Sequence, residues 1–119
     1  MDWLRDRLVA VLQWQLANPG AVAGHDDPFV PPAGHRVWGI FLALNSARGS
    51  SGFGPLPIGL QDMEAYQRLA RTPIRPFEID IIQALDRAYL EAAAAKHGDK
   101  RQEVSTRPLS PALFDAVFG

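Results

Sequence analysis

The chain has no cysteine, no excess of either charge and no apolar run long enough to cross a bilayer. The absence of cysteine excludes disulfides, thiolate catalysis and zinc sites with cysteine ligands. Twelve Lys and Arg residues against thirteen Asp and Glu residues leave a net charge of −1, which provides no field to attract nucleic acid or an anionic membrane. The apolar run from Val37 to Leu44 is far shorter than the roughly 20 residues of a membrane-spanning helix. We therefore expect neither nucleic acid nor a membrane among the partners.

The N-terminal residues also lack the pattern of a secretory signal. Asp2, Arg5, Asp6 and Arg7 interrupt the region where a signal peptide would be apolar, so we expect a soluble protein that is not exported. A length of 119 residues, 47% of them apolar, is typical of one globular domain. A cytoplasmic location is the simplest expectation.

No segment shows strand-like alternation of useful length, whereas apolar residues recur at helical spacing in several segments. The pattern predicts an all-α fold, a small single-domain bundle of about four helices with a short C-terminal helix. The expected helices are residues 2–17, 35–47, 59–70 and 76–96, and Gly98 is the expected stop of the last one. Residues 1–97 would form the helical domain, with an irregular connector at 18–34, and residues 98–119 a charged linker followed by a short amphipathic segment.

The third helix is expected to begin near Gly59 with acidic residues in its first turns. The next helix would follow the restart signal at Pro76, with Glu78 in its first turn and Arg75 in the capping position. Arg75 is a poor cap because it lacks a short oxygen-bearing side chain. The inward side of the third helix is expected to comprise Leu60, Met63, Tyr66 and Ala70.

The stretch from Ser46 to Gly59 contains four glycines and suggests a phosphate-binding loop at first sight. A Walker-type loop, however, needs a lysine that reaches the outer phosphates, and this stretch has none. Pro55 and Pro57 also lack the amide hydrogens that would point at an anion. The stretch therefore predicts a turn between two helices, and we expect no cofactor.

Carboxylates and histidines provide no compact catalytic or metal-binding pattern. The spacing of His25, Asp26, Asp27 and His35 fits a solvated loop better than a set of metal ligands, so we expect no metal. The carboxylates of the two middle helices are expected to serve helix starts and to pair with nearby arginines. These carboxylates are Glu64, Glu78, Asp80 and Asp86, and the arginines are Arg68, Arg71, Arg75 and Arg87.

A competing hypothesis is a small hydrolase that uses Glu64 and Asp86 for acid and base work. It requires a concave acidic pocket between the third and fourth helices. The serines stand in no recognisable nucleophile motif, and the residues as a whole favour a protein that is not an enzyme.

Large apolar side chains are distributed unusually along the chain. Aromatic residues are core residues by default, but they also anchor interfaces. The candidate partner-binding residues are Trp3, Trp14, Trp38, Leu113, Phe114, Val117 and Phe118. Whether the last four dock on this protein's own core or in a partner's groove stays open, because a segment this short does not form a stable isolated helix.

Read together, residues 34–93 resemble the tail assembly chaperones of long-tailed bacteriophages and prophages. The resemblance also extends to the ending "RPLSPALFDAVFG". It departs at Gly59 and Arg75, where the family often has a Ser or Thr cap, and at Tyr66, where tryptophan is frequent. The features that carry it are Trp38, Phe41, Arg48, "GPLPI" at 54–58, Met63, Ala65, Tyr66, Pro76, Phe77, Glu78 and "ALDRAYL" at 84–90.

The resemblance implies a helical, non-catalytic protein of the host bacterial cytoplasm. Such a chaperone would bind the phage tape-measure protein, keep it soluble, help to recruit the major tail protein and be absent from the finished particle. The alternative is a structural tail component or small adaptor that is retained in the virion. A homo-oligomer and a frameshifted companion product both stay open.

Overall fold

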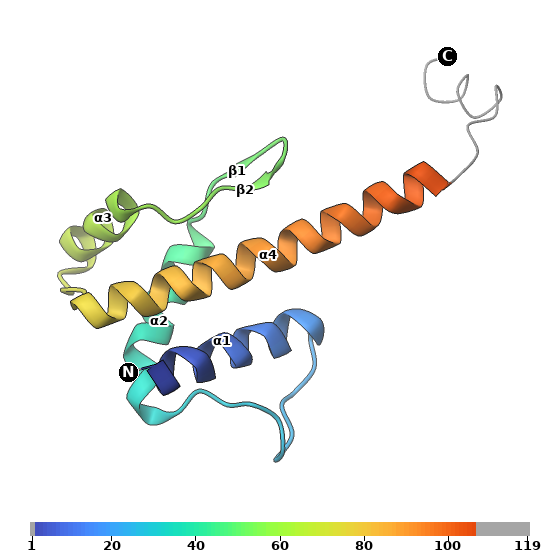
Figure 1. Ribbon diagram of the computed structural model, residues 1–119. Helices are drawn as coiled ribbons and strands as arrows, with labels where there is room; N and C mark the ends of the chain where they lie inside the picture. The colour runs from blue at the N-terminus through green and yellow to red at the C-terminus, as the bar shows by residue number, and fades with distance from the viewer. Residues whose placement is uncertain (1, 107–119) are drawn as a thin grey trace.

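The computed structural model describes residues 2–106, with the side chains of residues 2–96, and is mostly helical (Figure 1). The expected all-α fold is confirmed. The elements in chain order are α1 (Asp2–Ala17), the 3-10 turn η1 (Pro32–Gly34), α2 (His35–Ser46), β1 (Ser50–Ser51), β2 (Gly54–Pro55), α3 (Leu60–Ala70) and α4 (Pro76–Thr106).

The long helix α4 is the element on which the others assemble. Helix α1 lies along it and runs in the same direction (Figure 1). Asp2 is therefore close to Phe77 and Asp80, while Leu16 is close to Ala92. The helical spacing of the apolar residues explains this packing, because it places them on one face of each helix. The buried residues of these two helices are Leu4, Leu8, Val11, Leu12, Ile81, Ile82, Leu85 and Ala88.

Helix α2 contributes the largest side chains of the core. Phe41 is fully buried and lies 6.2 Å, centroid to centroid, from the ring of Trp38, which is 9% exposed. The chain enters α2 in close contact with α1, since a Cβ on Gly34 would lie 3.1 Å from methyl carbons of both Leu4 and Leu8. A glycine at this position therefore allows α1 and the start of α2 to approach each other.

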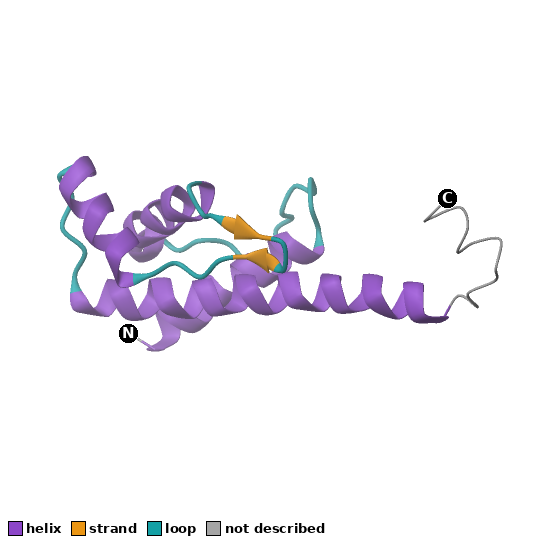
Figure 2. Cartoon of the chain, turned by 90° about the horizontal axis from the view of Figure 1, so that it is seen from above, coloured by secondary structure: helices purple, strands orange, loops and turns teal. Residues whose placement is uncertain are grey.

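The glycine-rich stretch forms a connection between α2 and α3, as predicted, but it contains a small hairpin that was not predicted. Strands β1 and β2 are antiparallel, and Ser51 pairs with Gly54, whose φ of +127° is readily available only to glycine (Figure 2). The strands are only two residues long, so they leave little alternation to detect in the sequence.

Helix α3 has few buried residues. Met63 is buried and Tyr66 is half-buried, as expected, whereas Leu60 and Ala70 are exposed, so their expected inward position was wrong. The helix packs mainly on α2 and covers only a narrow part of the core. The remaining apolar side chains of α3 are left at the surface.

Helix α4 does not stop at Gly98 but continues to Thr106 (Figure 1). The expected stop was wrong because a glycine inside a helix costs only about 1 kcal/mol relative to alanine, which good helix formers on both sides can offset. The part of α4 beyond Lys96 extends past the end of α1. Within the described residues, no helix combines the length and apolar character that crossing a membrane requires.

Candidate functional site

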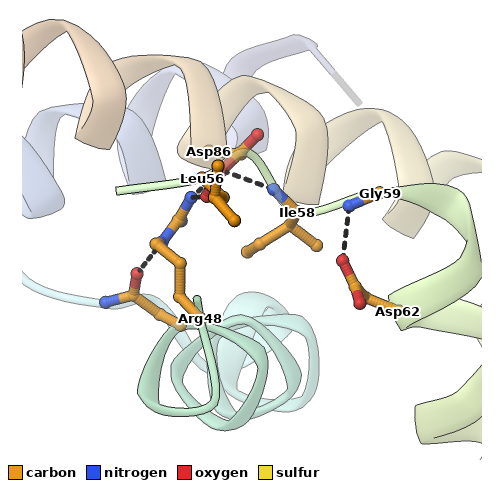
Figure 3. A network of polar contacts seen from close by, with 7 residues as sticks. Arg48, Leu56, Ile58, Gly59, Asp62 and Asp86 are labelled. Carbon is orange, nitrogen blue, oxygen red and sulfur yellow. Dashed lines mark hydrogen bonds and ion pairs between the residues drawn. The ribbon is translucent and has the colours of Figure 1, made fainter. Parts of the chain in front are cut away.

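A buried ion pair joins the end of α2 to the middle of α4 (Figure 3). Arg48 Nη1 lies 2.5 Å from Asp86 Oδ1, and the side chains are only 4% and 11% exposed. Arg48 also donates to the Leu56 carbonyl at 2.8 Å and to Asn45 Oδ1 at 2.9 Å. Its guanidinium carbon lies 4.5 Å from the centre of the Tyr89 ring. These contacts fix the guanidinium between two helices and the chain that leaves the hairpin.

Asp86 also holds the chain that leads into α3. Its Oδ1 accepts the Ile58 amide at 3.3 Å, so one carboxylate binds both an arginine and a backbone donor. Next along the chain, the Asp62 carboxylate accepts the Gly59 amide at 2.7 Å. Asp62 thereby satisfies a free amide at the start of α3, which compensates for the missing Ser or Thr cap.

A second arginine and carboxylate pair joins the start of α2 to the start of α4. Arg36 Nε donates to Glu78 Oε2 at 3.0 Å, and another of its nitrogens donates to the Pro73 carbonyl. Glu78 Oε1 accepts the Arg75 amide at 2.9 Å, and the Glu78 side chain is 3% exposed. Glu78 therefore serves the start of its helix, as predicted, although Arg75 itself is a poor cap.

The two pairs share one arrangement. Arg36 at the start of α2 and Arg48 just after its end each bind a buried carboxylate of α4 and a backbone carbonyl next to α3. These carbonyls belong to Pro73, which follows α3, and Leu56, which precedes it. Helix α3 is thereby tied at both ends. The carboxylates were expected to pair with Arg68, Arg71, Arg75 or Arg87. For Glu78 and Asp86 this was wrong, because Arg36 in α2 and Arg48 just after α2, and not the sequence neighbours, are the ion-pair partners.

The carboxylates proposed for a hydrolase do not share a pocket in the described part of the chain. Glu64 is exposed and lies at a shallow hollow with Gln67, Arg68 and Arg71, whereas Asp86 is buried against Arg48. The concave acidic pocket required by that hypothesis is not formed by this pair.

Two of the residues considered as metal ligands, Asp27 and His35, make local contacts. Asp27 Oδ2 accepts the Gly24 amide at 2.7 Å, and His35 Nε2 lies 3.2 Å from the Val30 carbonyl oxygen. Among residues 2–106, no three His, Cys, Asp or Glu residues are grouped as metal ligands would be. Asp27 thus stabilises a turn of the connector.

An apolar groove, here called the α2–α3 groove, lies between α2 and α3 and has a volume of about 280 Å³. Small side chains on both helices leave this space open, and Leu69, which is 82% exposed, stands at its edge. This groove was not predicted from the sequence. A detectable signal was the pair of alanines four positions apart, Ala43 and Ala47, which both line the groove. The groove is lined by Ala43, Leu44, Ala47, Arg48, Gly49, Pro57, Ile58, Asp62, Ala65, Tyr66, Leu69 and Ala70.

The structure separates the candidate partner-binding tryptophans. Trp3 on α1 is 61% exposed, Trp14 is half-buried, and Trp38 lies in the core. They do not form one surface, because Trp38 faces inward while Trp3 faces solvent. Leu113, Phe114, Val117 and Phe118 lie outside the described residues.

Comparison with known proteins identifies one family. The family model described as "Phage tail assembly chaperone" matches residues 17–91, which is more than half of the chain. The matched range includes both arginine and carboxylate pairs and the α2–α3 groove. No curated protein and no solved structure matches the chain.

Proposed function

The chain belongs to the phage tail assembly chaperone family, and we propose that it binds the tape-measure protein during tail assembly and keeps it soluble. In this proposal it acts without catalysis in the host bacterial cytoplasm and leaves before the particle is complete. The major tail protein is a second proposed partner.

The observation that supports this proposal, beyond the family, is the number of large apolar side chains exposed on a domain with a well-packed core. Trp3, Phe53 and Leu69 are each more than half exposed, although α1, α2 and α4 bury a continuous set of apolar residues. A tape-measure protein presents long amphipathic helices, which need a transient apolar cover until they are assembled.

We propose two contact surfaces for this client. The first is the outer side of α1 around Trp3 and Trp14, and the second is the segment that contains Leu113, Phe114, Val117 and Phe118. Trp38 is left out of the proposed surface because its side chain packs against Phe41.

The test is co-expression with the tape-measure protein encoded in the same phage genome, followed by co-purification. The full-length chain is compared with a chain truncated after Arg107. We expect the full-length chain to capture the tape-measure protein and raise its soluble fraction, and we expect truncation to reduce both.

Purified particles are then analysed for this chain by mass spectrometry. Absence from finished particles together with capture supports the chaperone function. Failure of capture by both chains, together with stoichiometric presence in particles, would overturn it in favour of the structural tail component.

A further inference from the structure

We propose that residues 111–118 of one chain dock in the α2–α3 groove of a second copy of the same chain. This contact would form in the protein without its client and does not depend on tape-measure binding. Three observations support it. The groove is apolar, the apolar residues of the segment have helical spacing, and α4 carries the segment far from the groove of its own chain.

The groove is suited to an apolar helix. Ala43 of α2, Ala47 just after α2 and Ala65 of α3 line the groove, and these short side chains leave a hollow large enough for bulky apolar side chains. Leu69 at the edge is 82% exposed, so an apolar helix laid beside it would remove a large apolar surface from water.

The segment has the pattern of a helix that docks in such a groove. Ser110 and Pro111 provide an N-cap and a first helical position, and Leu113 and Val117 are four residues apart. Phe114 and Phe118 repeat this spacing one position later, so all four fall on one side of a helix. A helix this short is marginal alone and becomes stable only when its apolar face is covered.

The groove of the same chain is out of reach while α4 is intact. Ile58 and Arg48, which line the groove, both contact Asp86, so Asp86 marks the position of the groove along α4. At about 1.5 Å per residue, α4 carries the chain about 30 Å beyond Asp86 before it reaches Thr106. With residues 111–118 helical, Pro111 would lie at most about 18 Å from Thr106 and the helix would add about 12 Å, so only Phe118 could reach the level of Asp86 and the segment as a whole could not lie in the groove. A second copy can present its groove without this restriction.

Substitutions of two leucines of α3 test whether the groove binds the segment. Leu69 and Leu60 are both exposed, but only Leu69 lines the groove. Self-association is measured by sedimentation velocity over a range of concentrations for the full chain, Leu69→Asp, Leu60→Asp and the chain truncated after Arg107. We expect Leu69→Asp and the truncation to weaken association at least about tenfold, and Leu60→Asp to leave it within about twofold.

Mixing the two defective chains gives the decisive measurement. Leu69→Asp keeps the segment but loses the groove, whereas the truncated chain keeps the groove but lacks the segment. We expect each chain alone to be monomeric at concentrations where the full chain associates, and the mixture to form a one-to-one complex at those concentrations. The proposal is overturned if the full chain is monomeric, if the truncated chain associates as well as the full chain, if Leu60→Asp is as damaging as Leu69→Asp, or if the mixture forms no complex.

Discussion

Arg48 and Asp86, 38 positions apart in the sequence, form a buried ion pair that joins α2 to α4, with 2.5 Å between Nη1 and Oδ1. Because Arg48 also binds the Leu56 carbonyl and Asp86 the Ile58 amide, the pair fixes the chain on the way to α3. A buried pair of this kind is costly to break on one side, because the remaining charge has no partner and no water.

Single substitutions in this pair are expected to be strongly destabilising. We expect Asp86→Leu or Arg48→Met to lower the free energy of unfolding by about 3–5 kcal/mol, measured by urea denaturation. The double variant should be less destabilised than the sum of the two, by at least about 1 kcal/mol, since it leaves no unpaired charge. If the losses in unfolding free energy of the two single variants simply add in the double variant, Arg48 and Asp86 are not energetically coupled. As a control, Arg5→Ala removes only exposed pairs and should cost less than about 1 kcal/mol.

Glu78 and Glu64 offer a comparison of a buried carboxylate with an exposed one. Glu78→Ala removes the partner of Arg36 and the acceptor of the Arg75 amide at the start of α4. We expect it to lower the free energy of unfolding by about 1–2 kcal/mol, because the part-buried hydrogen bonds from Arg36 and from the Arg75 amide both lose their acceptor. Glu64→Ala, at an exposed position, should change it by less than about 0.5 kcal/mol. If Glu78→Ala and Glu64→Ala lower the unfolding free energy equally in urea denaturation, the buried contacts of Glu78 do not stabilise the fold.

Two glycines of the α2 region are expected to respond to alanine in opposite directions. Gly34→Ala places a methyl group 3.1 Å from side-chain carbons of Leu4 and Leu8, which are fully packed, and should cost about 1–2 kcal/mol. Gly39 has open space at its Cβ position and lies inside α2, so Gly39→Ala should stabilise the protein by about 0.5–1 kcal/mol. The melting temperatures of the two variants check the prediction. A higher melting temperature for Gly34→Ala would contradict the close contact between α1 and the start of α2.

Trp3 is expected to matter for the client and not for folding. Its ring is 61% exposed, so Trp3→Asp should leave the urea midpoint nearly unchanged. If α1 forms part of the proposed tape-measure surface, the variant should capture roughly tenfold less tape-measure protein. Val22→Asp, at a position 93% exposed in the connector, is the control for an added surface charge. Equal capture by the two variants would exclude Trp3 from the contact.

Much of the fold was predictable because helical spacing is a local property. Leu4, Leu8 and Val11 recur at intervals that place them on one face, and they are buried in α1. The connection between α2 and α3 was predictable from its glycines, whereas its two-residue strands were too short to leave a pattern. The end of α4 was misjudged because one glycine lowers helix stability without preventing it.

The candidate site was less predictable than the fold. Glu78 was correctly assigned to a helix start, but its partner Arg36 is 42 positions away and gave no sequence signal. The tryptophans looked alike in the sequence, yet the structure buries Trp38 and exposes Trp3. The α2–α3 groove depends on two helices meeting through small side chains, and no single segment shows that meeting.

By itself the sequence determined the all-α class, the positions of four helices and the resemblance to tail assembly chaperones, because periodicity, turn residues and motifs are set by neighbours along the chain. Only the tertiary structure decided which arginine meets which carboxylate, which tryptophan is covered and where an apolar groove stays open. The physical reason is that burial and charge pairing depend on which faces of distant helices come into contact. That choice is made by packing the whole domain.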